Sequence, residues 1–132
     1  MAPAPAAEAP VVLVATTDPA DRVQLPAHLG NPRYQLVFAG SMAEVRTLLK
    51  ESSVAVLVAE ANVGTASWRD FISAIRETGG HSRLIVFDAR ADEALWLDVL
   101  DSGGFDVILK PGGARQLRDS VQTAFADWLY LR

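Results

Sequence analysis

The sequence predicts an α/β fold, a three-layer sandwich in which helices cover both faces of a five-stranded parallel sheet. Short, continuous apolar runs alternate with amphipathic stretches of helical length. Such runs are typical of strands buried on both faces, and their alternation with helices favours parallel pairing with right-handed crossovers. The chain has 132 residues, of which 50% are hydrophobic, so it is long enough for one domain with its own core.

Five apolar runs mark the expected strands. They lie at residues 11–15, 34–39, 54–59, 84–87 and 105–109. Five parallel strands joined by helices, (βα)5, favour the flavodoxin-like order 2-1-3-4-5, which places any site at the carboxyl ends of the strands. The residues found at such ends are Thr16, Thr17, Glu60, Asp88 and Lys110.

Capping signals mark where the helices begin. Asp18 is a candidate N-cap, followed by Pro19 at the first helical position and Asp21 in the first turn. Pro26 cannot donate a backbone N–H, so this helix is expected to be short or kinked. The other helices are expected from 41 to about 51, from 67 to the glycines at 79–80, from 92 to 101, and after the glycines at 112–113.

Composition and charge exclude several classes of function. The net charge is −4 without a cluster of Lys or Arg, so we expect no nucleic-acid partner, because phosphate contacts need a basic patch. Cysteine is absent, which excludes disulfides and thiol chemistry. No apolar run approaches the roughly 20 residues of a membrane span. We therefore expect a cytoplasmic domain over residues 11–132, preceded by a disordered Ala/Pro-rich leader over residues 1–10.

Residues 100–111, LDSGGFDVILKP, resemble without a gap the "LEAGADDYLTKP" segment of response-regulator receiver domains. Residues 12–19, VLVATTDP, resemble that family's "ILVVDDDP", and residues 84–90, LIVFDAR, resemble "VIVLTAR". The spacing from Glu60 to Ile75 matches that from the family's phosphoacceptor aspartate to the isoleucine of "RRIR". The resemblance covers about residues 11–130 and implies the (βα)5 fold and a role in two-component or phosphorelay signalling.

Three departures from the family pattern bear on its chemistry. Thr16 and Thr17 stand where the family carries a metal-binding acidic pair, and Glu60 stands at the phosphoacceptor position. Mg²⁺ prefers oxygen ligands with negative charge nearby, and threonines offer neutral hydroxyls. We interpret the adjacent Asp18 as an N-cap and not as a ligand. The sequence thus predicts no metal, no cofactor and no catalytic residue.

Three further positions follow from the same resemblance. Asp88 replaces the switch threonine or serine, Val107 falls where many members carry the aromatic switch residue, and Lys110 matches the phosphate-sensing lysine. A carboxylate at Asp88 would repel a phosphoryl group. The extra methylene of Glu60 displaces its oxygens, and misplacement by about 1 Å can cost on the order of 100-fold in rate. We expect Glu60 to form instead a permanent ion pair with Lys110; the alternative is that Glu60 points to solvent.

The fourth expected helix carries unusual apolar residues. By alignment with receivers, Leu97 and Leu100 should face the core, which leaves Leu95, Trp96 and Val99 as an exposed patch. Exposed apolar patches mark partner binding, and Trp is enriched among interface hot spots. In the receiver family, the face of helix 4, strand 5 and helix 5 is the usual dimer and output surface. The alternative is a helix that is rotated or more deeply packed.

These observations predict a stand-alone, degenerate receiver, or pseudo-receiver, that is not an enzyme. It would act independently of phosphorylation by binding a protein partner, such as a histidine kinase, another response regulator or an output protein, or as a homodimer. One alternative is a receiver that is phosphorylated at Glu60. Another is a small-ligand or nucleotide-binding flavodoxin-like domain, in which Lys110 and Gly112 hold an anion at a helix N-terminus.

Overall fold

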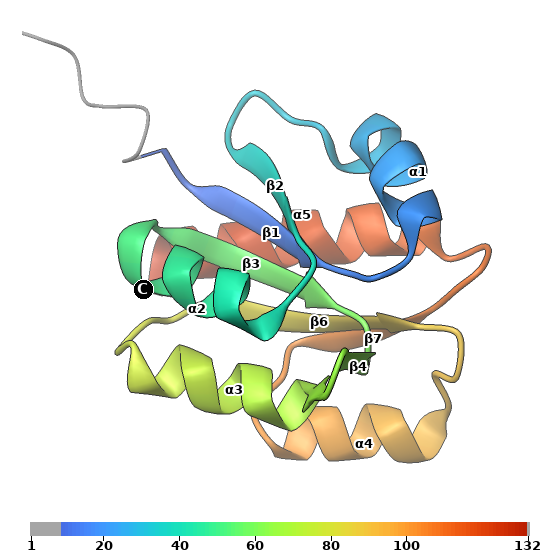
Figure 1. Ribbon diagram of the computed structural model, residues 1–132. Coiled ribbons are helices and arrows are strands. Elements are labelled where there is room, and N and C mark those ends of the chain that lie inside the picture. The colour runs from blue at the N-terminus through green and yellow to red at the C-terminus, as the bar shows by residue number, and fades with distance from the viewer. Residues whose placement is uncertain (1–8, 132) are drawn as a thin grey trace, which may run out of the picture.

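In a computed structural model that describes residues 9–131, five parallel strands form one sheet with helices on both faces (Figure 1). The strands are β1 (Val11–Ala15), β2 (Gln35–Ala39), β3 (Val54–Ala59), β6 (Arg83–Asp88) and β7 (Asp106–Leu109). Their spatial order is β2-β1-β3-β6-β7. Counted as five strands this is 2-1-3-4-5, the predicted order. Residues 1–8 of the expected leader lie outside the described residues.

The five helices begin close to the predicted residues. They are α1 (Pro19–Leu29), α2 (Met42–Glu51), α3 (Trp68–Glu77), α4 (Glu93–Asp101) and α5 (Ala114–Leu131). Asp18 caps α1 as predicted, since its side chain accepts the backbone N–H of Ala20 at 3.0 Å. Asp92 caps α4 by accepting the N–H of Leu95 at 2.8 Å. These caps pair N–H groups that have no partner within the helix.

The core consists of two layers, one on each face of the sheet. Successive side chains of a strand point to opposite faces. Val12 and Val14 of β1 therefore pack with α1 and α5, whereas Leu13 and Ala15 pack with the side of α2, α3 and α4. Figure 1 shows α1 and α5 on one side of the sheet and the other three helices on the opposite side. Every residue of β1 and β3 is buried, as their continuous apolar runs predict.

A short antiparallel hairpin, which the sequence analysis did not predict, joins β3 to α3. It consists of β4 (Asn62–Val63) and β5 (Ala66–Ser67). Gly64 in its turn has a φ of +62°, a conformation that residues with a Cβ rarely adopt. The hairpin folds back so that Trp68 donates its backbone N–H to the carbonyl of Ala61 at 2.9 Å. It thereby positions the first turn of α3 beside the end of β3.

The predicted orientation of α4 is wrong for Leu95, Leu97 and Val99. Val99 is fully buried and Leu95 packs against the same core, whereas Leu97 is 47% exposed. Trp96, at 42%, is exposed as expected. Leu95 and Val99 are four residues apart and so share one face of the helix. Gly104 allows Val99 to approach this closely, because a Cβ there would lie 2.3 Å from Val99 Cγ1.

None of the helices within residues 9–131 combines the length and the apolar character that crossing a membrane requires.

Candidate functional site

A buried ionic cluster lies where β1, β3 and β7 end. The ammonium Nζ of Lys110 is 2.8 Å from Asp21 Oδ2 and 3.2 Å from Glu60 Oε2. The three side chains are only 12%, 8% and 16% exposed, respectively. The ion pair between Glu60 and Lys110 is therefore confirmed, and the alternative of a solvent-facing Glu60 is wrong. We call Thr16, Thr17, Asp21, Glu60 and Lys110 the Lys110 cluster.

Asp21 is the member of the cluster that sequence reasoning missed. It was assigned only to the first turn of α1, where acidic residues favour the helix N-terminus. In the structure its Oδ2 accepts the hydroxyl of Thr16 at 2.6 Å as well as the ammonium of Lys110. One signal could have found it. Helical side chains lean toward the N-terminus of their helix, so an acid in the first turn after β1 leans toward the strand ends.

Both oxygens of Glu60 have hydrogen-bond donors. Oε1 accepts the backbone N–H of Thr17 at 2.7 Å and its hydroxyl at 3.1 Å, while Oε2 accepts from Lys110. Thr16 Oγ1 lies 3.1 Å from Glu60 but only 2.6 Å from Asp21. A hydroxyl has one proton to donate, and the shorter distance assigns it to Asp21. The two threonines thus hold the two carboxylates in place around the ammonium.

The cluster keeps Lys110 charged. Burial alone would lower its pKa. The hydrogen bond that Lys110 donates to Asp21 and the negative charges of Asp21 and Glu60 outweigh burial and raise the pKa of Lys110 above its ordinary value of 10.5. The ammonium also lies 5.3 Å from the centre of the Phe87 ring, a distance at which the ring face attracts a cation. Lys110 is therefore a fixed positive charge at neutral pH.

Asp88 forms a separate link at the end of β6. It is 6% exposed, its Oδ2 accepts the N–H of Ala61 at 2.8 Å, and its Oδ1 accepts the N–H of Arg90 at 2.8 Å. Burial raises the pKa of Asp88, but these N–H groups, with the charges of Arg90 and Lys110, outweigh it and lower the pKa below 3.8. Asp88 thus joins the end of β3 to the loop before α4. Val107, the other switch-position residue, packs partly buried against the core.

The donor groups of the Lys110 cluster do not fit Mg²⁺. Hard divalent cations need several oxygen ligands that are free to coordinate. Here the ammonium lies between the two carboxylates, and Asp18 uses Oδ1 to cap α1 while its Oδ2 lies 3.8 Å from Lys110. Within residues 9–131, no three acidic, His or Cys side chains converge to hold a metal. The same contacts weaken the alternative of an anion site at Gly112, because the ammonium of Lys110 already has two partners.

Comparison with known proteins relates the chain by its fold. No protein-family model and no curated protein matches the sequence. Solved structures do match. A response regulator from Thermotoga maritima has a TM-score of 0.76 at 22% identity, over 89% of this chain and 98% of that one. A CheY-like receiver domain from Methanospirillum hungatei JF-1 has a TM-score of 0.75 at 14% identity, over 93% and 98%.

The beryllofluoride-activated dimer of the NtrC4 receiver domain is also similar, with a TM-score of 0.79 at 21% identity, over 89% of this chain and 98% of that one. Each likeness covers nearly the whole of both chains while the sequences share little identity. The arrangement of strands and helices is therefore what they have in common. The chain has the fold of a response-regulator receiver domain.

Proposed function

We propose that this chain is a receiver-like regulatory domain of the two-component or phosphorelay type that works without phosphorylation and without enzymatic activity, by binding other proteins. The observation that carries the proposal is the Lys110 cluster. In it, a glutamate and an aspartate already hold the lysine that the resemblance assigns to sensing phosphate. Glu60 thus makes a permanent contact with Lys110, which corresponds to the contact that phosphorylation would create in a receiver.

Phosphoryl transfer to Glu60 conflicts with these contacts. A nucleophilic oxygen of Glu60 would have to leave either Thr17 or Lys110, which donate to its two oxygens. The incoming group would also bring negative charge next to Asp21, which is 8% exposed. Like charges repel strongly when they are removed from water. A divalent cation would relieve this repulsion, but the ammonium already lies between the two carboxylates.

The face formed by α4, β7 and α5 is the proposed binding surface. Trp96 and Leu97 of α4 are 42% and 47% exposed, and Leu109 at the end of the neighbouring β7 is 50% exposed. Exposed apolar side chains on adjacent elements favour association, and Trp is a common hot spot. A histidine kinase, another response regulator, an output protein or a second copy of this chain would fit. The dimeric NtrC4 receiver domain supports self-association as one form of this binding.

Titration with Mg²⁺ and beryllofluoride tests the proposal. The backbone NMR resonances of Thr17, Glu60 and Lys110 should show no saturable shift with millimolar Mg²⁺, and beryllofluoride should add none. Acetyl phosphate with Mg²⁺ should leave the mass of the protein unchanged. A phosphorylatable receiver domain treated in parallel is the positive control. A saturable response centred on Glu60, or a mass gain of one phosphoryl group, would overturn the proposal in favour of a receiver phosphorylated at an unusual site.

A further inference from the structure

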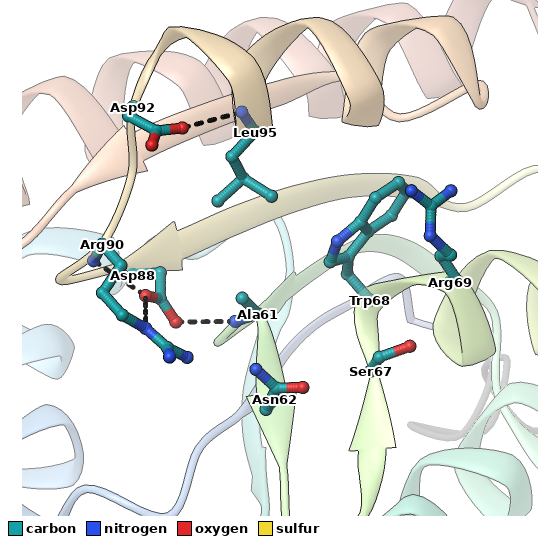
Figure 2. Close-up of a pocket in the computed structure, with 9 residues that line it drawn as sticks. All are labelled: Ala61, Asn62, Ser67, Trp68, Arg69, Asp88, Arg90, Asp92 and Leu95. Atoms are coloured by element: carbon teal, nitrogen blue, oxygen red, sulfur yellow. Dashed lines mark hydrogen bonds and ion pairs between the residues drawn. The ribbon is translucent and has the colours of Figure 1, made fainter.

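A pocket of about 330 Å³ lies between the start of α3 and the start of α4. Its walls come from the β4–β5 hairpin, the first turn of α3, and the loop from β6 into α4 (Figure 2). No member of the Lys110 cluster lines it. Its volume is at the small end of the range of about 300–1,000 Å³ that is typical of ligand sites. The pocket is therefore of a size for a small molecule and separate from the ionic cluster.

The apolar part of the pocket is formed by side chains from two helices. Leu95 reaches in from α4 and the indole of Trp68 forms the facing wall (Figure 2). Trp68 is only 7% exposed, and the guanidinium of Arg69 lies 4.3 Å from the centre of its ring. A cation at this distance is attracted to the face of the ring. A flat apolar group could pack between Leu95 and this indole.

The indole N–H of Trp68, a residue that is 7% exposed, is directed into the pocket. Figure 2 shows the indole nitrogen on the side of the ring that faces the pocket. An indole N–H can only donate, and none of the described residues accepts from it. No side-chain nitrogen or oxygen that is fully enclosed lacks a partner within residues 9–131, so this nitrogen borders open space. Buried Trp side chains usually find an acceptor, and here the pocket is the place for one.

Arg90 adds a second donor at the rim. Its side chain is 75% exposed, and its contact with Asp88 is made by Nε at 3.6 Å. The two terminal nitrogens contact no acceptor among the described residues, so the outer edge of the guanidinium is open to a ligand. That edge matches a carboxylate in a two-point geometry.

Three of the four carboxylate oxygens of Asp88 and Asp92 already accept a hydrogen bond. Asp88 accepts one backbone N–H on each oxygen, and Asp92 accepts the N–H of Leu95. Among the charged and aromatic side chains of the pocket, the groups without a partner in residues 9–131 are one oxygen of Asp92, the indole N–H of Trp68 and the outer edge of Arg90. A ligand that pairs with the two donors must supply acceptor oxygens next to a flat apolar body.

We propose that this pocket binds a small, flat organic carboxylate, with its ring between Leu95 and Trp68 and its carboxylate accepting hydrogen bonds from Trp68 Nε1 and Arg90. The proposal rests on the pocket alone and does not depend on whether the Lys110 cluster accepts phosphate. Its link to regulation is structural. Leu95 precedes the exposed Trp96 in the first turns of α4, so a ligand here contacts the helix that carries the proposed binding surface.

Benzoate is the probe for a direct test by NMR on the intact chain. The indole N–H of each of the three tryptophans gives its own resonance, and Trp68→Phe identifies that of Trp68. Benzoate should shift the Trp68 resonance in a saturable way and leave that of Trp128 unchanged. Benzamide has the same shape without the charge and should bind about tenfold more weakly, as expected for the loss of a charge-assisted contact.

Two matched arginine variants separate site binding from general attraction. Arg90→Gln should weaken benzoate binding about tenfold. Arg118→Gln removes a partly exposed arginine of α5 that does not line the pocket, so it should change nothing. Arg90 is exposed, which leaves the fold of that variant intact, and its NMR spectrum checks this. The proposal is overturned if neither benzoate nor the larger indole-3-acetate gives a saturable shift. It is also overturned if benzamide binds as tightly as benzoate, or if the two arginine variants behave alike.

Discussion

Lys110 has more negative charge around it than its own charge neutralises. Asp21 and Glu60 lie within 3.2 Å of its ammonium, and Asp18 lies at 3.8 Å. Removal of one carboxylate leaves an ion pair, whereas removal of the lysine leaves two buried carboxylates side by side. Variants of the cluster should therefore differ strongly in their effect on stability.

Lys110→Met should lower the free energy of unfolding by about 3 kcal/mol at neutral pH, because it leaves buried charges without a partner. Glu60→Gln should lower it by about 1 kcal/mol or less, since Lys110 keeps Asp21 and an amide oxygen can still accept. Urea unfolding followed by circular dichroism measures both. Equal losses for the two variants would contradict this account of the cluster.

The residues of the site were only partly predictable from the sequence. Glu60 and Lys110 each follow a parallel strand, and the ends of such strands meet at one edge of the sheet, so their pairing could be expected. Asp21 belongs to a helix, and the cap pattern gave it a sufficient local explanation. Its contact with Lys110 depends on how α1 is placed over the end of β1, which no local pattern specifies.

At the scale of elements, α4 combines two different faces. Val99 is fully buried while Trp96, three residues before it, is 42% exposed. The alignment with receivers placed this helix in the wrong register because both faces are apolar, which removes the contrast that hydrophobic periodicity depends on. The β4–β5 hairpin was missed for a similar reason, since strands of two residues are too short to show any alternation.

Substitutions on the two faces of α4 should separate stability from binding. Val99→Ala removes two buried methyl groups and should cost about 2 kcal/mol of unfolding free energy. Trp96→Ala should change it by less than about 0.5 kcal/mol, yet weaken partner binding or self-association by about 2 kcal/mol. Thermal unfolding and sedimentation or calorimetric titration are the measurements. Val23→Ala, on a side chain of α1 that is 80% exposed, is the control and should affect neither.

Asp88 connects two elements, and its loss should loosen the connection. Asp88→Ala leaves the N–H groups of Ala61 and Arg90 without their acceptor, and one such unpaired group costs about 1–3 kcal/mol. Amide hydrogen exchange should then become faster at Ala61 and Arg90, and at the first turn of α4. Exchange in α5, on the opposite face of the sheet, serves as the internal reference. Unchanged protection at Ala61 would show that the hydrogen bond from Ala61 to Asp88 contributes little.

For the molecule as a whole, the fold was far more predictable than the site. Strands such as β1 and β3 are buried along their entire length, and this gives uninterrupted apolar runs that are hard to mistake. The 14–22% identity to receiver structures of the same fold agrees with this, because many apolar sequences satisfy one burial pattern. Ionic contacts depend on single residues from distant elements, so the sequence shows no comparable pattern that would predict them.

The stability of the whole domain should decline in acid partly through Asp88. Its pKa lies below 3.8 in the folded protein, so the folded state binds the proton less readily than the unfolded chain. Its contribution is therefore complete above that value and is lost as the pH falls through the lower folded pKa. Asp88→Asn should have a lower free energy of unfolding than the parent protein at neutral pH. The difference between the two should shrink once the pH falls below about 3.8. A gap that stays constant down to acid unfolding would contradict the role of the charge.

The position of Asp21 has a consequence for protein engineering. Changing Thr16, Thr17 and Glu60 to aspartate would recreate the acidic residues that the resemblance associates with phosphorylation. Asp21 would remain 2.8 Å from Lys110, and the new carboxylate at position 16 would replace the hydroxyl that now donates to it at 2.6 Å. The triple variant would thus carry two facing acids and a lysine that is still engaged. Reconstruction of a working phosphorylation switch in this scaffold should require a fourth change, at Asp21, on a helix that a comparison of strand ends alone would leave untouched.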